Sequence, residues 1–379
     1  MDTLLTTYIR LRQIKGVSEQ TIRNLLSLRG TLAGLFDCTA HELFAMGVDL
    51  RTAHSIVDSD NHKYAEEELL KAHRIDGQII PLESDDYPTI LKEISDPPLL
   101  LYVIGDINCL KEFCIAVVGA RKVSRNGVDV TRKIASDLAS CGVTIVSGLA
   151  YGVDITAHTA ALSVDGATVA VLGSGLNKIY PAEHLQYIKE ICKKGCVISE
   201  YPMDEPPNPY NFPKRNRIVS GLSKGVLIAE ASNRSGSLIT CRLALEQGRD
   251  VFAVPISPLA ANNATNYMIK NGAILTQSYL DILREFGLQL EERLSEPIFA
   301  SEIERRIWEE LGIEPLGADE LVTRLDINSY KVMAAVAAME LENKVDKGND
   351  GRYYRVLGVL NETVTITLYS FNVLCLRKL

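Results

Sequence analysis

The sequence predicts an α/β protein whose centre is a doubly wound parallel sheet, with a helical module before it and a winged-helix-like module after it. Between residues 75 and 287, short apolar runs rich in β-branched residues alternate with longer helical patterns. Short helical patterns precede this region, and three more helical patterns with a strand-like ending follow it. A chain of 379 residues exceeds the usual single-domain range, which agrees with several modules.

The first module, residues 1–65, is predicted to contain several short helices. Its segments "TTYIRLRQIKG", "SEQTIRNLLSLRG" and "TAHELFAMG" each end at a glycine, and the second and third carry Ser or Thr where a helix N-cap is expected. The turn "IKGVS" resembles a helix-hairpin-helix or sterile-alpha-motif element. An ordinary helical bundle without nucleic-acid contacts explains the same pattern equally well.

The central region, residues 75–287, is predicted to form the sheet. Its strands are expected at "CIAVVGA", "VTIVSG", "TVAVLG", "CVISEY", "GVLIAE" and "DVFAVP". These runs are apolar on both faces and are spaced by stretches such as "GVDVTRKIASDLASCG", which favours a parallel sheet with helices on both sides.

The last module, residues 301–357, follows the charged connector "LQLEERLSEPIFASE". Helical patterns at "EIERRIWEELG", "GADELVTRLD" and "NSYKVMAAVAAMELEN" lead into a strand-like pair, the order typical of a winged helix. The tail, residues 358–379, has strand-like content but no place in that pattern and stays unassigned.

Composition narrows the class of protein. A hydrophobic content of 46% is ordinary for a globular chain, and the formal net charge of -8 argues against a generally basic coat for nucleic acid. No signal-peptide core and no run of 18 apolar residues is found, so we expect a cytoplasmic protein without a membrane span. The eight cysteines form no CxxC pair, which favours reduced thiols without bound metal.

The first candidate ligand loop follows the strand "CIAVVG". Gly119 and Arg121 stand at its carboxyl end, the edge at which open α/β sheets bind ligands, and Lys122 and Arg125 add charge without a nearby acid. An arginine after a strand can equally well cap a helix or pair with a carboxylate. A GxGxxG fingerprint is absent, which argues against a dinucleotide cofactor.

The second candidate is "FPKRNRIVSGLS", inside a stretch without acidic residues between Glu205 and Glu230. We expect "NFPKRN" to be a loop before a helix and to lie near the ligand edge if the crossover is right-handed. A solvated surface run is the plain alternative. Phe212 beside the cations indicates instead a base stacked on a ring while a cation holds phosphate. The cations and amide of this motif are Lys214, Arg215, Asn216 and Arg217.

Two further loops complete the expected edge. In "EASNRSGSLIT", Ser235, Gly236 and Ser237 stand at a helix start, which favours an anion but is also explained by simple N-capping. In "SGLAYGVDITAH", Ser147 and Gly148 end a strand, while Asp154 and His158 stand four apart on the next helix. That pair could do acid/base work, but a cap plus a buried histidine is the better interpretation. No nucleophile–base, P-loop or HExxH pattern is present, so the loops predict binding rather than catalysis.

Several long segments together resemble the DprA/Smf family of DNA-processing proteins. They are "VVGARKVSRNG", "IVSGLAYGVDITAH", "AVLGSGLNKIYP", "FPKRNRIVSGLS", "EASNRSGSLITCRLALEQGRDVFAVP" and "YPTILKEISDPPLLLYVIGD". The resemblance implies an extended Rossmann-like domain that binds single-stranded DNA, forms a homodimer and loads RecA recombinase during natural transformation, without a cofactor or a catalysed reaction. It places Gly119 and Arg121, the motif from Phe212 to Arg217, and Ser235–Ser237 in the DNA pocket.

The sequence departs from the family pattern at Ala120, Cys241 and Ile256. Ile256 matters most, because a β-branched residue in place of a glycine with positive φ would reshape the loop after it. The alternative function is a nucleotide phosphoribohydrolase of the lysine-decarboxylase-like group, with Glu230 and Arg234 as candidates. That group's glycine-rich signature is absent from the sequence.

Overall fold

The computed structural model describes residues 4–233, 235–260, 262–288, 299–311, 314–342, 344–348 and 351–355. Two compact units divide the chain after residue 289, and each is considered by itself. The connector over residues 289–298 and the unassigned tail lie outside the described residues.

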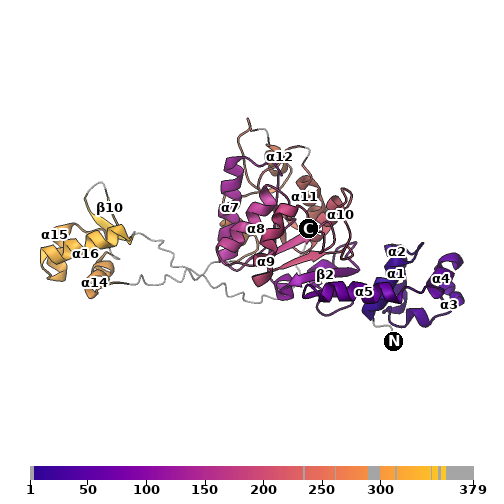
Figure 1. The fold of residues 1–379 in the computed structure, drawn as a ribbon. Helices are drawn as coiled ribbons and strands as arrows, with labels where there is room; N and C mark the ends of the chain where they lie inside the picture. Colours follow the sequence, from indigo (N-terminus) through magenta and orange to yellow (C-terminus); the bar gives the residue numbers. More distant parts are fainter. Residues whose placement is uncertain are drawn as a thin grey trace, which may run out of the picture. The chain divides into compact units, whose positions relative to one another are not determined.

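The helical module opens the first unit (Figure 1). Ser18 and Thr39 accept hydrogen bonds at the starts of the second and third helices, and Gly30, with φ of 75°, ends the second, so the three predicted helices are confirmed. The structure adds two helices that the sequence analysis did not identify, and the last of them extends beyond residue 65. The elements are α1 (Leu4–Gln13), α2 (Glu19–Arg29), η1 (Leu35–Asp37), α3 (Ala40–Ala45), α4 (Leu50–Val57) and α5 (His62–His73).

A nine-stranded sheet forms the centre of this unit, in the order β1-β2-β6-β5-β4-β3-β7-β8-β9. All six predicted strands are present, and they pair in parallel from β6 across to β9. The strands are β1 (Gly77–Pro81), β2 (Leu100–Gly105), β3 (Cys114–Val118), β4 (Thr144–Ser147), β5 (Thr168–Leu172), β6 (Cys196–Ser199), β7 (Gly225–Ile228), β8 (Asp250–Ala253) and β9 (Ile274–Leu275).

The sheet is mixed rather than wholly parallel, because β2 pairs antiparallel with both β1 and β6. β1 and β2 lie in the sequence between the helical module and the parallel strands. The rule of right-handed crossovers applies to parallel neighbours only, so it does not apply to the antiparallel pairs of β2. The predicted parallel sheet is correct for the core and incomplete at this edge.

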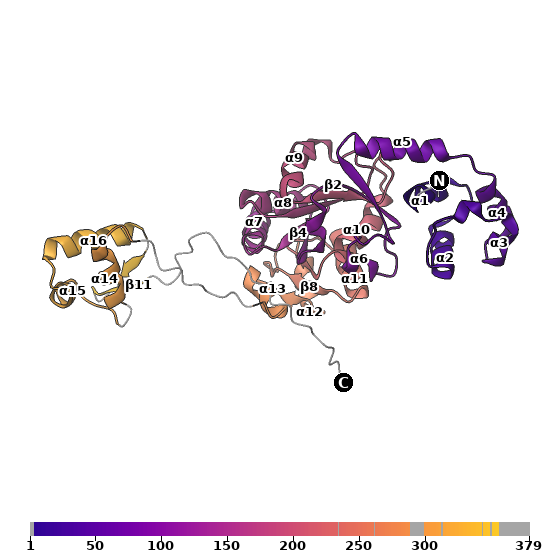
Figure 2. The same cartoon turned by 90° about the horizontal axis from the view of Figure 1, so that it is seen from below.

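Helices cover both faces of the sheet (Figures 1 and 2). Alternate residues of a strand point to opposite faces. On β5, Ala170 and Leu172 pack with Ile191 of α9, whereas Val169 and Val171 pack with Ile218 of α10. The helices and turns of the core are α6 (Thr89–Lys92), η2 (Ile107–Lys111), α7 (Arg125–Ser140), α8 (Val153–Ser163), η3 (Ala182–His184), α9 (Leu185–Lys194), α10 (Asn211–Gly221), α11 (Ser237–Glu246), α12 (Ala264–Lys270) and α13 (Tyr279–Glu285).

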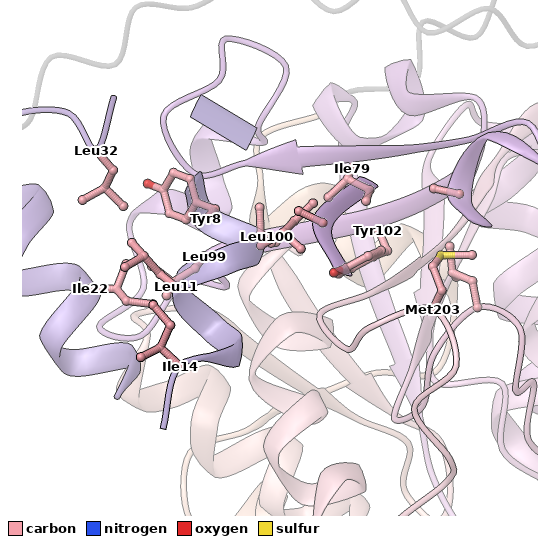
Figure 3. Packing of buried hydrophobic residues seen from close by; sticks show 14 of the residues in the cluster. Tyr8, Leu11, Ile14, Ile22, Leu32, Ile79, Leu99, Leu100, Tyr102 and Met203 are labelled. Atoms are coloured by element: carbon pink, nitrogen blue, oxygen red, sulfur yellow. The ribbon is translucent and has the colours of Figure 1, made fainter. Parts of the chain in front are cut away.

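One hydrophobic cluster joins the helical module to the sheet. Figure 3 shows Tyr8 and Leu11 of α1 and Ile22 of α2 in the same buried cluster as Leu100 and Tyr102 of β2. Burying this apolar surface stabilises the contact by about 25 cal/mol per Å². The helical module therefore packs onto the sheet through a shared core and can influence the loops beside it.

The second unit has the helix order and hairpin of a winged helix, as predicted. Its elements are α14 (Glu302–Glu310), α15 (Ala318–Leu325), α16 (Ser329–Leu341), β10 (Val345–Lys347) and β11 (Tyr353–Arg355). β10 and β11 pair antiparallel, and Leu316 adds a bridge to Tyr353. In the described parts of both units, no helix combines the length and hydropathy that crossing a bilayer requires.

Candidate nucleic-acid interface

A pocket opens at the carboxyl edge of the sheet, where the loops after β3, β4 and β5 meet the start of α10. Its lining consists of Arg121, Gly148, Ala150, Tyr151, Tyr180, Pro181 and Phe212. The sequence predicted a site at this edge and identified Arg121, Gly148 and Phe212. It missed the other four residues, although Tyr151 and Tyr180 stand in loops that also follow core strands.

Phe212 belongs to a helix rather than to a loop. α10 begins at Asn211, so "NFPKRN" forms its first turns, and the expectation of a loop before the helix is wrong. Pro213 permits this because a proline is tolerated in the first turn, where its missing N–H has no helical partner. The Phe212 ring lies against Gly173, where an added Cβ would come within 2.8 Å of the ring.

The pocket side chains bring a cation and two rings together. The Arg121 guanidinium carbon lies 5.8 Å from the centroid of the Phe212 ring. The centroid of the Tyr180 ring lies 5.5 Å from the same Phe212 centroid. Arg121, Lys122 and Arg125 are exposed, and none of them has an ion-pair partner among the described residues. Arg125 is also the first residue of α7, so its charge adds to the positive end of that helix. The three cations of this loop are therefore free to contact a ligand.

Arg215 is buried beneath the pocket. Its Nη1 donates to the carbonyl of Gly148 at 2.7 Å and also to the carbonyl of Val171. Burial lowers the pKa of Arg215 to about 10, despite the favourable charge of Asp154. Gly148 has to be glycine here, because a Cβ would lie 2.5 Å from the guanidinium. Arg215 therefore holds the floor of the pocket and is only 4% exposed.

Arg217 does not line the pocket. Its Nη1 and Nη2 donate to the two carboxylate oxygens of Glu200 at 2.8 and 2.7 Å, and its Nε donates to Asp96 Oδ2 at 3.0 Å. Burial acts to lower the pKa of Arg217, but the charges of Glu200 and Asp96 outweigh it and raise the pKa. The expectation that Arg217 faces the pocket with Arg121 is wrong, because carboxylates distant in sequence take up its donors.

Lys214 and Asn216 are less buried than Arg215 and Arg217. The Lys214 ammonium is 3.4 Å from Glu19 Oε1 of the helical module and 3.8 Å from Glu200 Oε2, while the side chain stays 41% exposed. Asn216 Nδ2 lies 3.5 Å from the carbonyl of Gly236, which links α10 to the start of α11.

Ser235, Gly236 and Ser237 stand at the start of α11, whose first residue is Ser237. The Ser235 hydroxyl accepts from the Ser237 N–H at 3.3 Å and lies 2.6 Å from the Ser237 hydroxyl. The N-cap residue of α11 is Gly236, and no side chain makes a capping hydrogen bond there, so the simple N-capping alternative is not confirmed. The three residues are not among those that line the pocket. Arg234 lies outside the described residues.

The loop after β4 is held from below in a fixed shape. Leu149 has a positive φ of 55°, which is uncommon for a leucine. Asp154 Oδ2 accepts from the N–H groups of Gly148 at 3.2 Å and Ala150 at 3.4 Å, and His184 Nδ1 lies 2.8 Å from the Leu149 carbonyl. Burial raises the pKa of Asp154. These contacts preorganise the backbone that lines the pocket.

His158 and Ser147 are buried and make hydrogen bonds within the sheet region. His158 is fully buried, its Nδ1 lies 2.7 Å from the Thr168 hydroxyl, and burial lowers its pKa to about 3. Ser147 donates its hydroxyl hydrogen bond to the carbonyl of Val117 at 2.6 Å. The contacts of Asp154 and His158 agree with the interpretation as a loop-capping acid and a buried histidine.

Glu230 fills the space at the start of α7. Its carboxylate is fully buried and accepts from the N–H of Ser124 at 3.0 Å, the Ser124 hydroxyl at 2.5 Å and Asn262 Nδ2 at 2.6 Å. Gly127 makes room for it, since a Cβ there would lie 2.2 Å from Glu230 Oε2. A helix start beside adjacent parallel strands is a usual phosphate site, and here a protein carboxylate occupies it. In the parts of the chain that are described, no cluster of three metal-ligating side chains is present.

The family model "DNA recombination-mediator protein A" matches residues 78–287, and the model "DprA winged helix domain" matches residues 294–351. The chain belongs to the DprA/Smf family. It is 45% identical over 247 residues to Protein Smf of Escherichia coli K12, covering 64% of this chain and 66% of that protein. It is also 45% identical over 203 residues to the DNA processing protein DprA of Streptococcus pneumoniae R6, covering 53% of this chain and 72% of that protein.

Two solved DprA structures resemble this one. The X-ray structure of S. pneumoniae DprA aligns with a TM-score of 0.67 and 34% identity, covering 75% of this chain and 99% of that one. A Helicobacter pylori DprA structure, described for its "unique single-stranded DNA binding mode", aligns with a TM-score of 0.51 and 31% identity, covering 56% of this chain and 96% of that one.

The departure from the DprA/Smf pattern at Ile256 does not distort the backbone. Ile256 is not among the non-glycine residues with positive φ. Its N–H donates to Asn266 Oδ1 at 3.0 Å, and Asn266 Nδ2 donates to its carbonyl at 2.7 Å. The side-chain amide of Asn266 fixes this segment, so no glycine is required there.

Proposed function

We propose that this DprA/Smf protein binds single-stranded DNA at the pocket between Arg121, Tyr180 and Phe212, and delivers the strand to RecA recombinase during natural transformation. Family membership and the single-stranded DNA binding mode for which the H. pylori relative's structure is described support the choice of ligand. The proposal includes action as a homodimer and the absence of a catalysed reaction.

The observation that carries the proposal is an exposed arginine without an ion-pair partner among the described residues, beside the half-buried ring of Phe212 and the exposed ring of Tyr180. Arg121 has no ion-pair partner among the described residues, so the N–H groups of its guanidinium can all donate hydrogen bonds to a phosphate. Phe212 lies beside it, and a base that leaves the stack can lie on such a ring. In a duplex the bases are paired and stacked inside the helix, so only a single strand can use both contacts.

The direct test is a salt titration of binding to oligo-dT and to a matched duplex. If about four phosphates are neutralised, a log–log plot of affinity against salt should have a slope near -3, from about -0.7 per contact on single strands. Equal affinity for duplex, or affinity independent of salt, contradicts the proposal.

Arg121→Ala tests the proposed phosphate contact. Loss of a charge-assisted hydrogen bond typically costs about 1.5 to 3 kcal/mol, so affinity for oligo-dT should fall at least tenfold and the salt slope should become shallower. Arg132→Ala is the matched control, because Arg132 is 60% exposed on α7 and pairs locally with Asp129. Equal losses in both variants would place the DNA away from the pocket.

RecA delivery and dimerisation need their own measurements. Strand exchange with a strand precoated by single-strand binding protein should start faster with the wild type than with Arg121→Ala, and light scattering should give twice the chain mass of 41.7 kDa. A wild type that binds oligo-dT but never accelerates exchange would limit the proposal to DNA binding.

The absence of catalysis is tested with AMP as substrate and release of free adenine as the readout. The phosphoribohydrolase alternative uses Glu230, whose carboxylate is fully buried and hydrogen-bonded to Ser124 and Asn262. Because these groups occupy it, we expect no adenine release. Release that disappears in Glu230→Gln would favour the alternative.

A further inference from the structure

Tyr180 contributes an exposed ring to the pocket, where it contacts the ring of Phe212. Its side chain is 41% exposed, and its hydroxyl makes no hydrogen bond to the described residues. A lone exposed tyrosine needs no explanation. Tyr180, however, lies 5.5 Å from Phe212 and lines the same pocket as Arg121.

The loop that carries Tyr180 is rigidly held. The Ser174 hydroxyl donates to the Lys178 carbonyl at 2.7 Å, and the N–H of Asn177 donates to the Met203 carbonyl at 2.9 Å. Gly175 packs so closely that a Cβ would lie 2.1 Å from the Pro202 carbonyl oxygen. The loop therefore presents the ring in one place, so little conformational entropy is lost when a ligand binds.

The helical module braces the same loop from behind. Asn177 Nδ2 donates to Asp204 Oδ1 at 2.9 Å, and Asp204 pairs with Lys71 of α5 at 2.8 Å. Glu68, also on α5, accepts from the N–H of Met203 at 2.5 Å. A surface loop fixed by this many contacts presents its exposed ring as a preformed platform.

The spacing of the two rings limits how a strand can use them. The ring planes are inclined by 50° with centroids 5.5 Å apart, so no base fits between them. Each ring can take a base only on a face directed away from the other ring. The 5.5 Å separation also exceeds the rise of about 3.4 Å per nucleotide in a duplex strand, so two neighbouring bases on these rings must be unstacked from each other.

We propose that Tyr180 is a second stacking platform, which takes the base next to the one on Phe212 and selects an unstacked strand. This inference rests on the proposed function of the pocket. The lining has no amide or carboxylate side chain to read base edges, so the platform accepts any base and selects for strand flexibility.

The test compares Tyr180→Leu with Tyr180→Phe in binding to oligo-dT at fixed salt. The leucine variant should bind about fivefold to a hundredfold more weakly, the range for loss of one stacked base, while the phenylalanine variant stays near the wild type. The salt slope should be unchanged in both, since no charge is removed. Phe44→Leu is the matched control, because Phe44 is 56% exposed on α3 and does not line the pocket.

Photo-crosslinking separates contact from support of the loop. Oligo-dT containing 5-iododeoxyuridine should crosslink to the peptide that holds Tyr180, and the crosslink should be lost in Tyr180→Leu. Wild-type affinity in Tyr180→Leu, absence of this crosslink, or an equal loss in Phe44→Leu each overturn the inference. If Arg121→Ala weakens binding and Tyr180→Leu does not, only this inference fails; if the wild type binds no single strand, the proposed function fails with it.

Discussion

The two basic stretches of the first unit look alike in sequence and differ in structure. Arg121, Lys122 and Arg125 are exposed and lack ion-pair partners among the described residues. On α10, Lys214 and Arg217 contact carboxylates, and Arg215 donates to backbone carbonyls beneath the pocket. The first stretch supplies charge for a ligand, and the second mostly holds the site together.

The difference arises from acids that are remote in sequence. Glu205 to Glu230 contains no acid between its ends, yet Glu19, Asp96 and Glu200 approach α10 once the chain folds. A run of cations that is free of local acids therefore predicts positive charge only until tertiary contacts neutralise it. The α10 motif contributes to the pocket in two ways. Phe212 lines it, and Arg215 holds the backbone of Gly148 from beneath.

Arg217→Met should have the largest effect of the changes considered, and it should lower the free energy of unfolding. It leaves the Glu200 carboxylate buried without its bidentate partner, and breaking a buried pair in this way typically costs about 3 to 5 kcal/mol. Urea unfolding followed by circular dichroism measures the loss. Arg121→Met, the matched change at an exposed arginine, should stay within about 0.5 kcal/mol of the wild type.

The pH dependence of stability gives an independent check. Burial acts to raise the pKa of Glu200, but the charge and hydrogen bonds of Arg217 outweigh it and hold the pKa below its ordinary value. The ionised carboxylate thus stabilises the fold above its unfolded pKa of about 4.3, and this stability is lost as the pH falls through the folded value. In Glu200→Gln, the free energy of unfolding should fall less steeply as the pH is lowered. An unchanged fall at acidic pH would show that the pair contributes little.

Gly173→Ala should have an intermediate effect, on both stability and binding. The added methyl group would lie 2.8 Å from the Phe212 ring, so the ring must move, at a typical cost of about 1 to 3 kcal/mol, and oligo-dT affinity should fall with it. Gly236→Ala is the matched control, since nothing lies within 4 Å of its Cβ position and its φ of -62° suits any residue. If Gly236→Ala instead weakens binding more, the start of α11 contacts DNA and the pocket is too narrowly defined.

Much of the architecture followed from local signals. Both-sided apolar runs identified the six core strands, and Ser18, Thr39 and Gly30 marked helix ends, because capping depends on neighbouring residues alone. The antiparallel β1 and β2 were missed because the parallel pattern of the core was extended to the edge of the sheet.

At the site, the sequence predicted the edge and several of its residues but not their roles. Arg121 and Phe212 meet as expected, because the loop after β3 and the start of α10 lie at the same carboxyl edge of the sheet. The burial of Arg215 and Arg217 could not be predicted from the sequence, because it depends on Gly148, which follows β4, and on Glu200, which follows β6. Tyr180 was missed because its ring carries no charge or motif.

Glu19→Gln should have the smallest effect and the opposite sign, slightly tighter binding. Glu19, on α2 of the helical module, holds the Lys214 ammonium at 3.4 Å beside the start of α10. An exposed pair of this kind is worth about 0 to 1 kcal/mol, so releasing Lys214 toward a phosphate should raise oligo-dT affinity by up to about fivefold at low salt. The gain should vanish in a Lys214→Ala background, as a double-mutant cycle would show. Glu67→Gln removes the same charge from α5, where Glu67 pairs with Lys63, and should leave affinity unchanged. Equal gains from Glu19→Gln and Glu67→Gln would mean that net charge alone controls binding and that the helical module does not restrain Lys214.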